Sequence, residues 1–82
     1  MAIPTSQQIC EALSDDLNKG GSKPVTKVIN DSARKTFTAS MNGAVFEFPH
    51  RQPDGNFWDG YKFYGSGMRS RIRIKRTPIE AE

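Results

Sequence analysis

Residues 36–48, TFTASMNGAVFEF, alternate apolar and polar side chains on both sides of the pair Asn42-Gly43. Asn-Gly is the preferred centre of a type I′ turn, whose twist suits the two-residue loop of an antiparallel hairpin. Such a loop fixes the strand register, and the residues it pairs lie on one apolar face because side chains alternate along a strand. The predicted pairs are Met41 with Ala44, Ala39 with Phe46, and Phe37 with Phe48.

Residues 6–19 show the pattern of an amphipathic helix. Thr5 and Gln8 have the spacing of a capping box, in which each side chain bonds the other residue's backbone amide. Ile9, Leu13 and Leu17 recur every four residues and therefore line one face of the helix. The glycine pair at 20–21 favours termination of the helix. The acidic residues of this segment are expected to be solvated: Glu11, Asp15 and Asp16.

Residues 22–34 are compatible with two structures. Apolar residues at 25, 28, 29 and 33 could form one face of a helix, whereas the β-branched residues between 25 and 29 favour a strand. Pro24 could begin either element. We favour the strand.

Two more strands are predicted at residues 57–64 and 69–75, separated by the turn-forming residues Gly65-Ser66-Gly67. A four-residue loop would place Tyr61 and Phe63 on the same face as the isoleucines of the last strand. The opposite face would carry Lys62, Tyr64 and the cations of the last strand. The predicted pairs are Tyr64 with Arg69, Lys62 with Arg71, and Tyr61 with Ile72.

These elements predict an α+β fold, with an N-terminal amphipathic helix packed on one face of a four- or five-stranded antiparallel sheet. A chain of 82 residues is expected to form a single domain over residues 1–82, with 78–82 as a frayed tail. The chain starts with Met and has no secretory signal or long apolar run. We therefore expect a complete small reading frame and a cytoplasmic protein.

Charge is distributed unevenly along the chain. Twelve Lys and Arg against nine Asp and Glu give a net charge of +3, but residues 68–76, MRSRIRIKR, carry five cations and no acid. An Arg-rich sheet face with aromatic neighbours suits phosphate contacts and base stacking. We therefore predict a small binding module for nucleic-acid backbone. The candidate contact residues are Arg69, Arg71, Arg73, Lys75, Lys62, Tyr64, Arg51 and Trp58.

Three other interpretations remain open at this stage. The cations could simply keep an edge strand solvated. They could instead pair with an acidic surface of a larger protein, as in an inhibitor or accessory protein of the phage or mobile-element type. A homodimer is also compatible with the sequence, because the helix acids could pair with the basic strand of a second copy.

Trp58 could stack on a base or close the end of the core, and Tyr64 is the preferred stacking residue.

The sequence gives little support for an enzymatic function. A general base at His50 would need a carboxylate to orient it, and Asp54 or Asp59 would have to reach the imidazole. Cys10 is the only cysteine and His50 the only histidine, too few for a usual zinc site. Cys10 flanks the apolar stripe of the helix and is expected to be a buried hydrophobe. We expect no enzyme activity and no cofactor.

Overall fold

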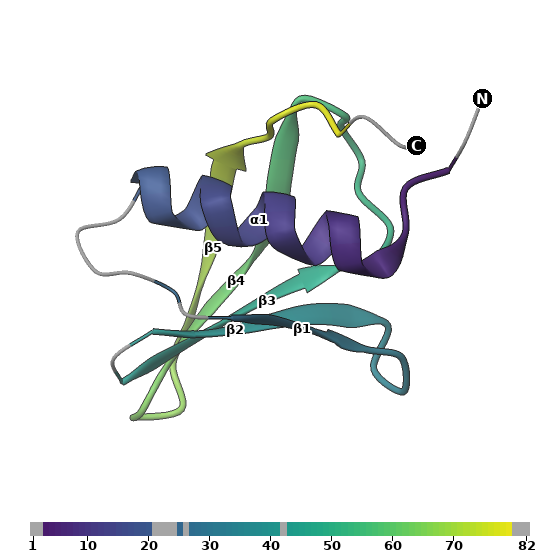
Figure 1. Ribbon diagram of the computed structural model, residues 1–82. Coiled ribbons are helices and arrows are strands. Elements are labelled where there is room, and N and C mark those ends of the chain that lie inside the picture. Colours follow the sequence, from purple (N-terminus) through teal and green to yellow (C-terminus); the bar gives the residue numbers. More distant parts are fainter. Residues whose placement is uncertain (1–2, 21–24, 26, 42, 80–82) are drawn as a thin grey trace.

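The computed structural model describes residues 3–20, 25, 27–41 and 43–79. A helix packs on one face of a five-stranded antiparallel sheet whose strands lie in chain order (Figure 1). In the view of Figure 1, β1 and β2 lie below α1, and the ends of β4 and β5 rise behind it. The predicted fold class is confirmed. The elements are α1 (Ser6–Gly20), β1 (Val28–Asp31), β2 (Thr36–Met41), β3 (Ala44–Pro49), β4 (Phe57–Tyr64) and β5 (Arg69–Lys75).

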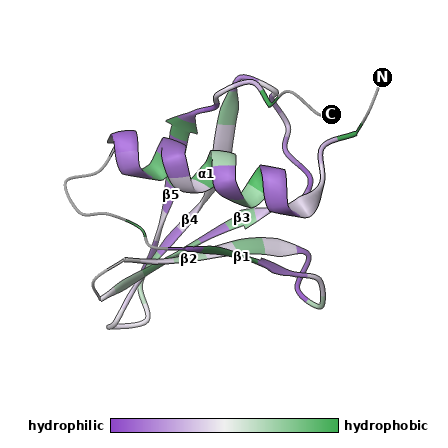
Figure 2. Ribbon diagram, viewed as in Figure 1, coloured by the Kyte–Doolittle hydropathy of each residue, from purple (hydrophilic) through white to green (hydrophobic). Residues whose placement is uncertain are grey.

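The start of α1 is held by the predicted capping box. The backbone N of Thr5 donates to Gln8 Oε1 at 2.8 Å, and the backbone N of Gln8 donates to Thr5 Oγ1 at 3.2 Å. Two residues of the apolar stripe, Leu13 and Leu17, are buried against the sheet. Figure 2 shows the hydrophilic residues of α1 alternating with this apolar stripe.

The hairpin of β2 and β3 has the predicted register. Phe37 lies opposite Phe48, and Ala39 opposite Phe46. Gly43 has a φ of 85°, as the second position of a type I′ turn requires. Asn42 lies outside the described residues. Turn chemistry and side-chain alternation specify the same pairing here, and the prediction is confirmed.

A strand occupies part of the segment 22–34. Val28–Asp31 forms β1, so the preference for a strand is confirmed there. Positions 22–24 and 26 lie outside the described residues. Val25 is buried, and its backbone N donates to Asn18 Oδ1 at 2.6 Å. This hydrogen bond ties the approach to β1 to the last turns of α1.

The predicted register of β4 and β5 is wrong by one residue. Tyr64 lies opposite Met68: the backbone N of Tyr64 donates to the carbonyl of Met68 at 2.8 Å, and the N of Gly67 to the carbonyl of Tyr64 at 3.0 Å. Gly67 has a φ of 87°. These features define a three-residue loop with its last residue left-handed, instead of the four-residue loop we expected. The ladder therefore pairs Phe63 with Arg69 and Tyr61 with Arg71.

This shift reverses the faces of β4, because a one-residue change of register moves every side chain to the other side of the sheet. Lys62 lies opposite Phe46, a residue of the core face, and Tyr64 lies opposite Ala44. Both therefore occupy the helix side of the sheet, and their predicted place on the outer face is wrong. The residues of β4 on the outer face are Phe57, Asp59, Tyr61 and Phe63.

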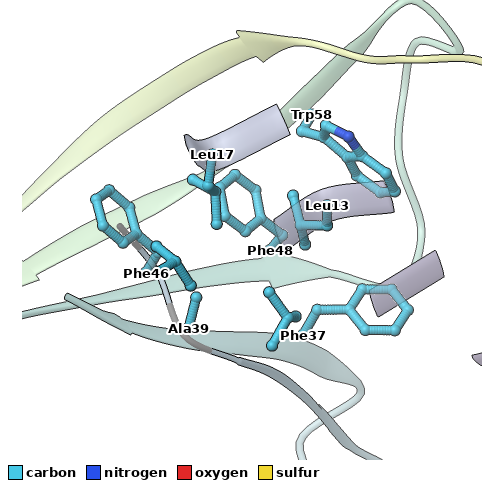
Figure 3. Packing of buried hydrophobic residues seen from close by; sticks show 9 residues of the cluster. Leu13, Leu17, Phe37, Ala39, Phe46, Phe48 and Trp58 are labelled. Atoms are coloured by element: carbon cyan, nitrogen blue, oxygen red, sulfur yellow. The ribbon is translucent and has the colours of Figure 1, made fainter. Parts of the chain in front are cut away.

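The core lies between α1 and the sheet. Figure 3 shows side chains of the helix and of β2, β3 and β4 directed into this layer. Trp58, Phe48 and Leu13 are its largest fully buried members. Ile72 and Ile74 of β5 pack against it while the cations between them point away. The buried residues are Leu13, Leu17, Val25, Val28, Phe37, Ala39, Phe46, Phe48 and Trp58.

The loop between β3 and β4 is closed by the side chain of Gln52. Its Nε2 donates to the carbonyls of Pro49 and Asp59, at 2.7 and 3.1 Å, and its Oε1 accepts the backbone N–H of Asp59 at 2.7 Å. The amide thus contributes one donor and one acceptor to Asp59, as a neighbouring peptide unit would. Gln52 extends the β3–β4 pairing beyond the end of the backbone ladder.

The carboxylate of Asp16 fastens the C-terminal segment to the helix. Asp16 is only 5% exposed, so its predicted place on a solvated helix face is wrong. It accepts hydrogen bonds from Trp58 Nε1 and from the backbone N of Thr77, both at 2.9 Å, and also from Thr77 Oγ1. Ile79, which lies in the segment 78–82 that is expected to fray, packs against the core. Residues 80–82 lie outside the described part of the chain.

Candidate nucleic-acid interface

Two neighbouring strands place aromatic and cationic side chains on the sheet face that α1 does not cover. β5 contributes its cations because they alternate with Ile72 and Ile74, which point to the core. β4 contributes its aromatic residues through the three-residue loop described above. We call this surface the aromatic–basic face. Its members are Phe57, Asp59, Tyr61 and Phe63 of β4 and Arg69, Arg71, Arg73 and Lys75 of β5.

Arg73 is held by a carboxylate of the same face. Its Nε lies 2.7 Å from Asp59 Oδ1, and its second contact, Nη2 to Oδ2, is 3.4 Å. The hydrogen bond from Arg73 holds the pKa of Asp59 below its usual value of 3.8, and the same bond raises the pKa of Arg73. Because the carboxyl pKa is lowered, the pair contributes fully to stability at every pH above the usual pKa of the carboxyl. That contribution is lost only as the pH falls through the lowered pKa. Arg73 is therefore engaged at neutral pH.

Two arginines also lie against aromatic rings of β4. The guanidinium carbon of Arg69 is 4.9 Å from the ring centre of Tyr61, and that of Arg73 is 4.9 Å from the ring centre of Phe57. Both distances fall within the range of cation–π contacts. The contacts lay the two side chains diagonally across the strand pair, which restricts their motion. A pre-ordered guanidinium loses less conformational entropy when it binds an anion.

Three cations of the aromatic–basic face form no ion pair within the described part of the chain. Within the described part of the chain, the ion pairs are Arg73 with Asp59 and Arg34 with Glu47. Arg69, Arg71 and Lys75 are exposed and have no acidic side chain within 4.0 Å among those residues. The positive charge available to a ligand on this face is thus concentrated along β5.

The other predicted contact residues lie elsewhere. Trp58 is only 1% exposed and donates to Asp16, with Arg76 over its ring at 4.3 Å. Trp58 closes the core, which is the second of the two roles that its sequence position suggests. Lys62 lies on the helix side, where its Nζ is 5.6 Å from the ring centre of Phe46 and 5.2 Å from that of Tyr64. Arg51 is exposed in the β3–β4 loop, outside the two strands of the aromatic–basic face.

The residues considered for general-base chemistry do not converge. His50 Nε2 lies 2.7 Å from the amide oxygen Oδ1 of Asn30, and the imidazole packs on Phe37 with ring centres 4.6 Å apart. Asp54 caps its own turn by accepting the backbone N–H of Asn56. Asp59 is bound to Arg73. The partner of His50 is therefore an amide, and neither candidate carboxylate orients it.

Cys10 flanks the helix stripe as expected and packs against the core, although it is only partly buried. Burial, and secondarily the charge of Glu11, raises the pKa of its thiol. A raised pKa keeps the thiol protonated and unreactive at neutral pH. In the described ranges, the His, Cys, Asp and Glu side chains form no group of three suited to a metal ion.

Sequence reasoning misplaced two aromatic residues of β4, Tyr61 and Phe63. The pattern groups them with the isoleucines of the last strand, because a face of isoleucines and aromatics is typical of a core. The signal that could have placed them is Gly67, because a glycine at the end of a short loop suits the left-handed position of a three-residue hairpin.

Comparison with known proteins gives no relative to guide the interpretation: no family model, curated protein or solved structure matches the chain. Over the residues that the structure describes, no helix has the length and apolar character needed to cross a membrane. The functional interpretation therefore depends on the aromatic–basic face itself.

Replacing Asp59 with asparagine is expected to increase the affinity of this face for anions. The change removes the one carboxylate that binds Arg73 and adds a fourth available cation to the three on β5. If phosphates are the ligand, the slope of log K against log salt becomes steeper by about 0.9. Asp15→Asn is the matched control, because Asp15 is an exposed carboxylate on α1, which covers the other side of the sheet. An unchanged affinity in Asp59→Asn would show that Arg73 does not reach the ligand.

Proposed function

We propose that the chain is a small non-enzymatic module that binds nucleic-acid backbone through the aromatic–basic face. The observation that carries the proposal is the row of three exposed cations on β5, Arg69, Arg71 and Lys75, none of which forms an ion pair with a carboxylate of the described chain. Cations spaced along one strand match the repeated charges of a phosphate backbone. Arginine supports this because its planar guanidinium makes bidentate contacts to phosphate.

The salt dependence of binding tests this proposal. Three phosphate contacts release about three condensed counterions, so log K should fall with log salt at about −0.9 × 3 = −2.7 on duplex DNA, or about −0.7 × 3 = −2.1 on a single strand. Fluorescence anisotropy with labelled oligonucleotides, titrated between about 50 and 200 mM salt, measures the slope. A flat salt dependence rules the proposal out.

A charge variant assigns the contact to this face. Arg71→Ala should weaken binding to all sequences similarly and reduce the size of the slope by about 1. Lys27→Ala is the matched control, because Lys27 is an exposed cation just before β1, at the opposite edge of the sheet from β5. Equal losses in the two variants would indicate binding by net charge alone.

A second candidate function is supported by apolar side chains on the same side of the sheet. Ile29 of β1 is 56% exposed and Val45 of β3 is 37% exposed, and their ladder partners place both on the outer face. Exposed apolar side chains on the same side of the sheet as the arginines also suit a protein partner with an acidic surface, as for a small inhibitor or accessory protein. A stoichiometric complex that survives nuclease treatment and is lost in Val45→Asp would favour this alternative.

A further inference from the structure

The aromatic residues of β4 face the side of the sheet that the helix leaves open. Phe57, Tyr61 and Phe63 are only partly buried there, whereas Lys62 occupies the helix-side position opposite Phe46. The strand thus buries Trp58 but leaves three other aromatic rings on the open face. Aromatic rings that stay at a charged surface commonly mark a binding site.

We propose that the aromatic–basic face takes single-stranded nucleic acid, with unpaired bases stacked on Tyr61 and Phe63 and phosphates on Arg69 and Arg71. The inference depends on the proposed function above and specifies its ligand class. Base stacking on aromatic side chains, combined with a cationic track for the backbone, is the usual means by which proteins hold single strands.

Ring spacing excludes a stacked duplex from these positions. The ring centres of Tyr61 and Phe63 are 6.4 Å apart, with planes tilted by 51°. Successive bases in a duplex are stacked about 3.4 Å apart, so their faces are covered and their repeat does not match these rings. A strand that can unstack its bases can place one base on each ring.

The cations lie where the backbone of such a strand would run. Arg71 is directly opposite Tyr61 in the ladder, and Arg69 is opposite Phe63. Each ring thus has a guanidinium as its cross-strand neighbour, close to a base stacked on that ring. Arg69 lies over the Tyr61 ring at 4.9 Å, so a base at this position either stacks on the guanidinium plane or displaces it toward a phosphate.

The test compares one single-stranded oligonucleotide of about twelve nucleotides with the duplex of the same sequence, at one salt concentration. Tyr61→Leu and Phe63→Leu remove the aromatic ring but keep apolar bulk, and Tyr61→Phe keeps the ring. Ser40→Ala is the control, because Ser40 is exposed on the same side of the sheet but on β2. Thermal unfolding followed by circular dichroism confirms that each variant is folded.

We expect the wild-type chain to prefer the single strand, and each leucine variant to lose about five-fold or more of that affinity with little change on duplex. Tyr61→Phe and Ser40→Ala should keep the wild-type affinity. Equal affinity for both oligonucleotides, or full single-strand affinity in both leucine variants, overturns this inference but leaves the proposed function standing when Arg71→Ala still weakens binding. Absence of salt-dependent binding to either oligonucleotide overturns both.

Discussion

Gly60→Ala is expected to destabilise the protein by about 3 kcal/mol or more, toward or beyond the upper end for an overpacked site. A Cβ built at Gly60 would lie 2.3 Å from the carbonyl oxygen of Glu47 and 2.6 Å from Cδ1 of Phe48. The first neighbour is backbone in β3, and the second belongs to a fully buried ring. Neither atom can move without separating β3 from β4 or displacing the core.

Thermal unfolding measures this effect. For a chain of this size, each kcal/mol corresponds to about 4–8 °C in Tm, so 3 kcal/mol lowers Tm by about 12–24 °C. Gly65→Ala is the matched control, because a Cβ at Gly65 meets no heavy atom within 4 Å. A Tm for Gly60→Ala within a few degrees of the control would contradict the close approach of the two strands.

Asp16→Ala is expected to have the second large effect on stability. The change removes the acceptor for Trp58 Nε1 and for the backbone N of Thr77. Hydrogen bonds to a charged group contribute about 1.5–3 kcal/mol each, so the loss of two costs about 3–6 kcal/mol. Since Trp58 is only 1% exposed, water cannot readily replace the lost acceptor at its indole nitrogen.

Chemical denaturation, followed by the fluorescence of the single tryptophan, measures the loss of free energy of unfolding. Asp15→Ala is the matched control, because Asp15 is the exposed neighbour on the same helix. A red-shifted emission from the folded Asp16→Ala variant would show that the C-terminal segment has detached and that water reaches the indole. Equal stability of the two variants would contradict the role of Asp16 in holding Trp58 and the C-terminal segment against the helix.

The contrast between the two hairpins shows what sequence patterns can specify. Asn42-Gly43 has one favoured loop length, so turn and alternation agreed and the β2–β3 register was predictable. Gly65-Ser66-Gly67 allows a three- or four-residue loop, and the choice depends on the left-handed backbone of Gly67. The alternation of arginine and isoleucine predicted the faces of β5 correctly. For β4, with apolar side chains on both sides, alternation could not distinguish the faces.

Asp16 was misplaced for a related reason. An acidic residue on a helix next to another acid is typical of a solvated surface, whereas Trp58 was open to two roles, stacking on a base or closing the core. Their roles depend on a hydrogen bond between residues 42 positions apart, which no local pattern reveals. Tertiary packing buries both residues as one hydrogen-bonded pair.

The hydrogen bonds of Gln52 connect the β3–β4 loop to the ion pair between Asp59 and Arg73 of β5. Gln52 fixes the backbone of Asp59 through two bonds, and the side chain of Asp59 holds Arg73. A ligand or modification that displaced the loop would therefore loosen Asp59 and release a guanidinium onto the surface of β5. A loop that touches no ligand could in this way adjust how strongly the sheet attracts one.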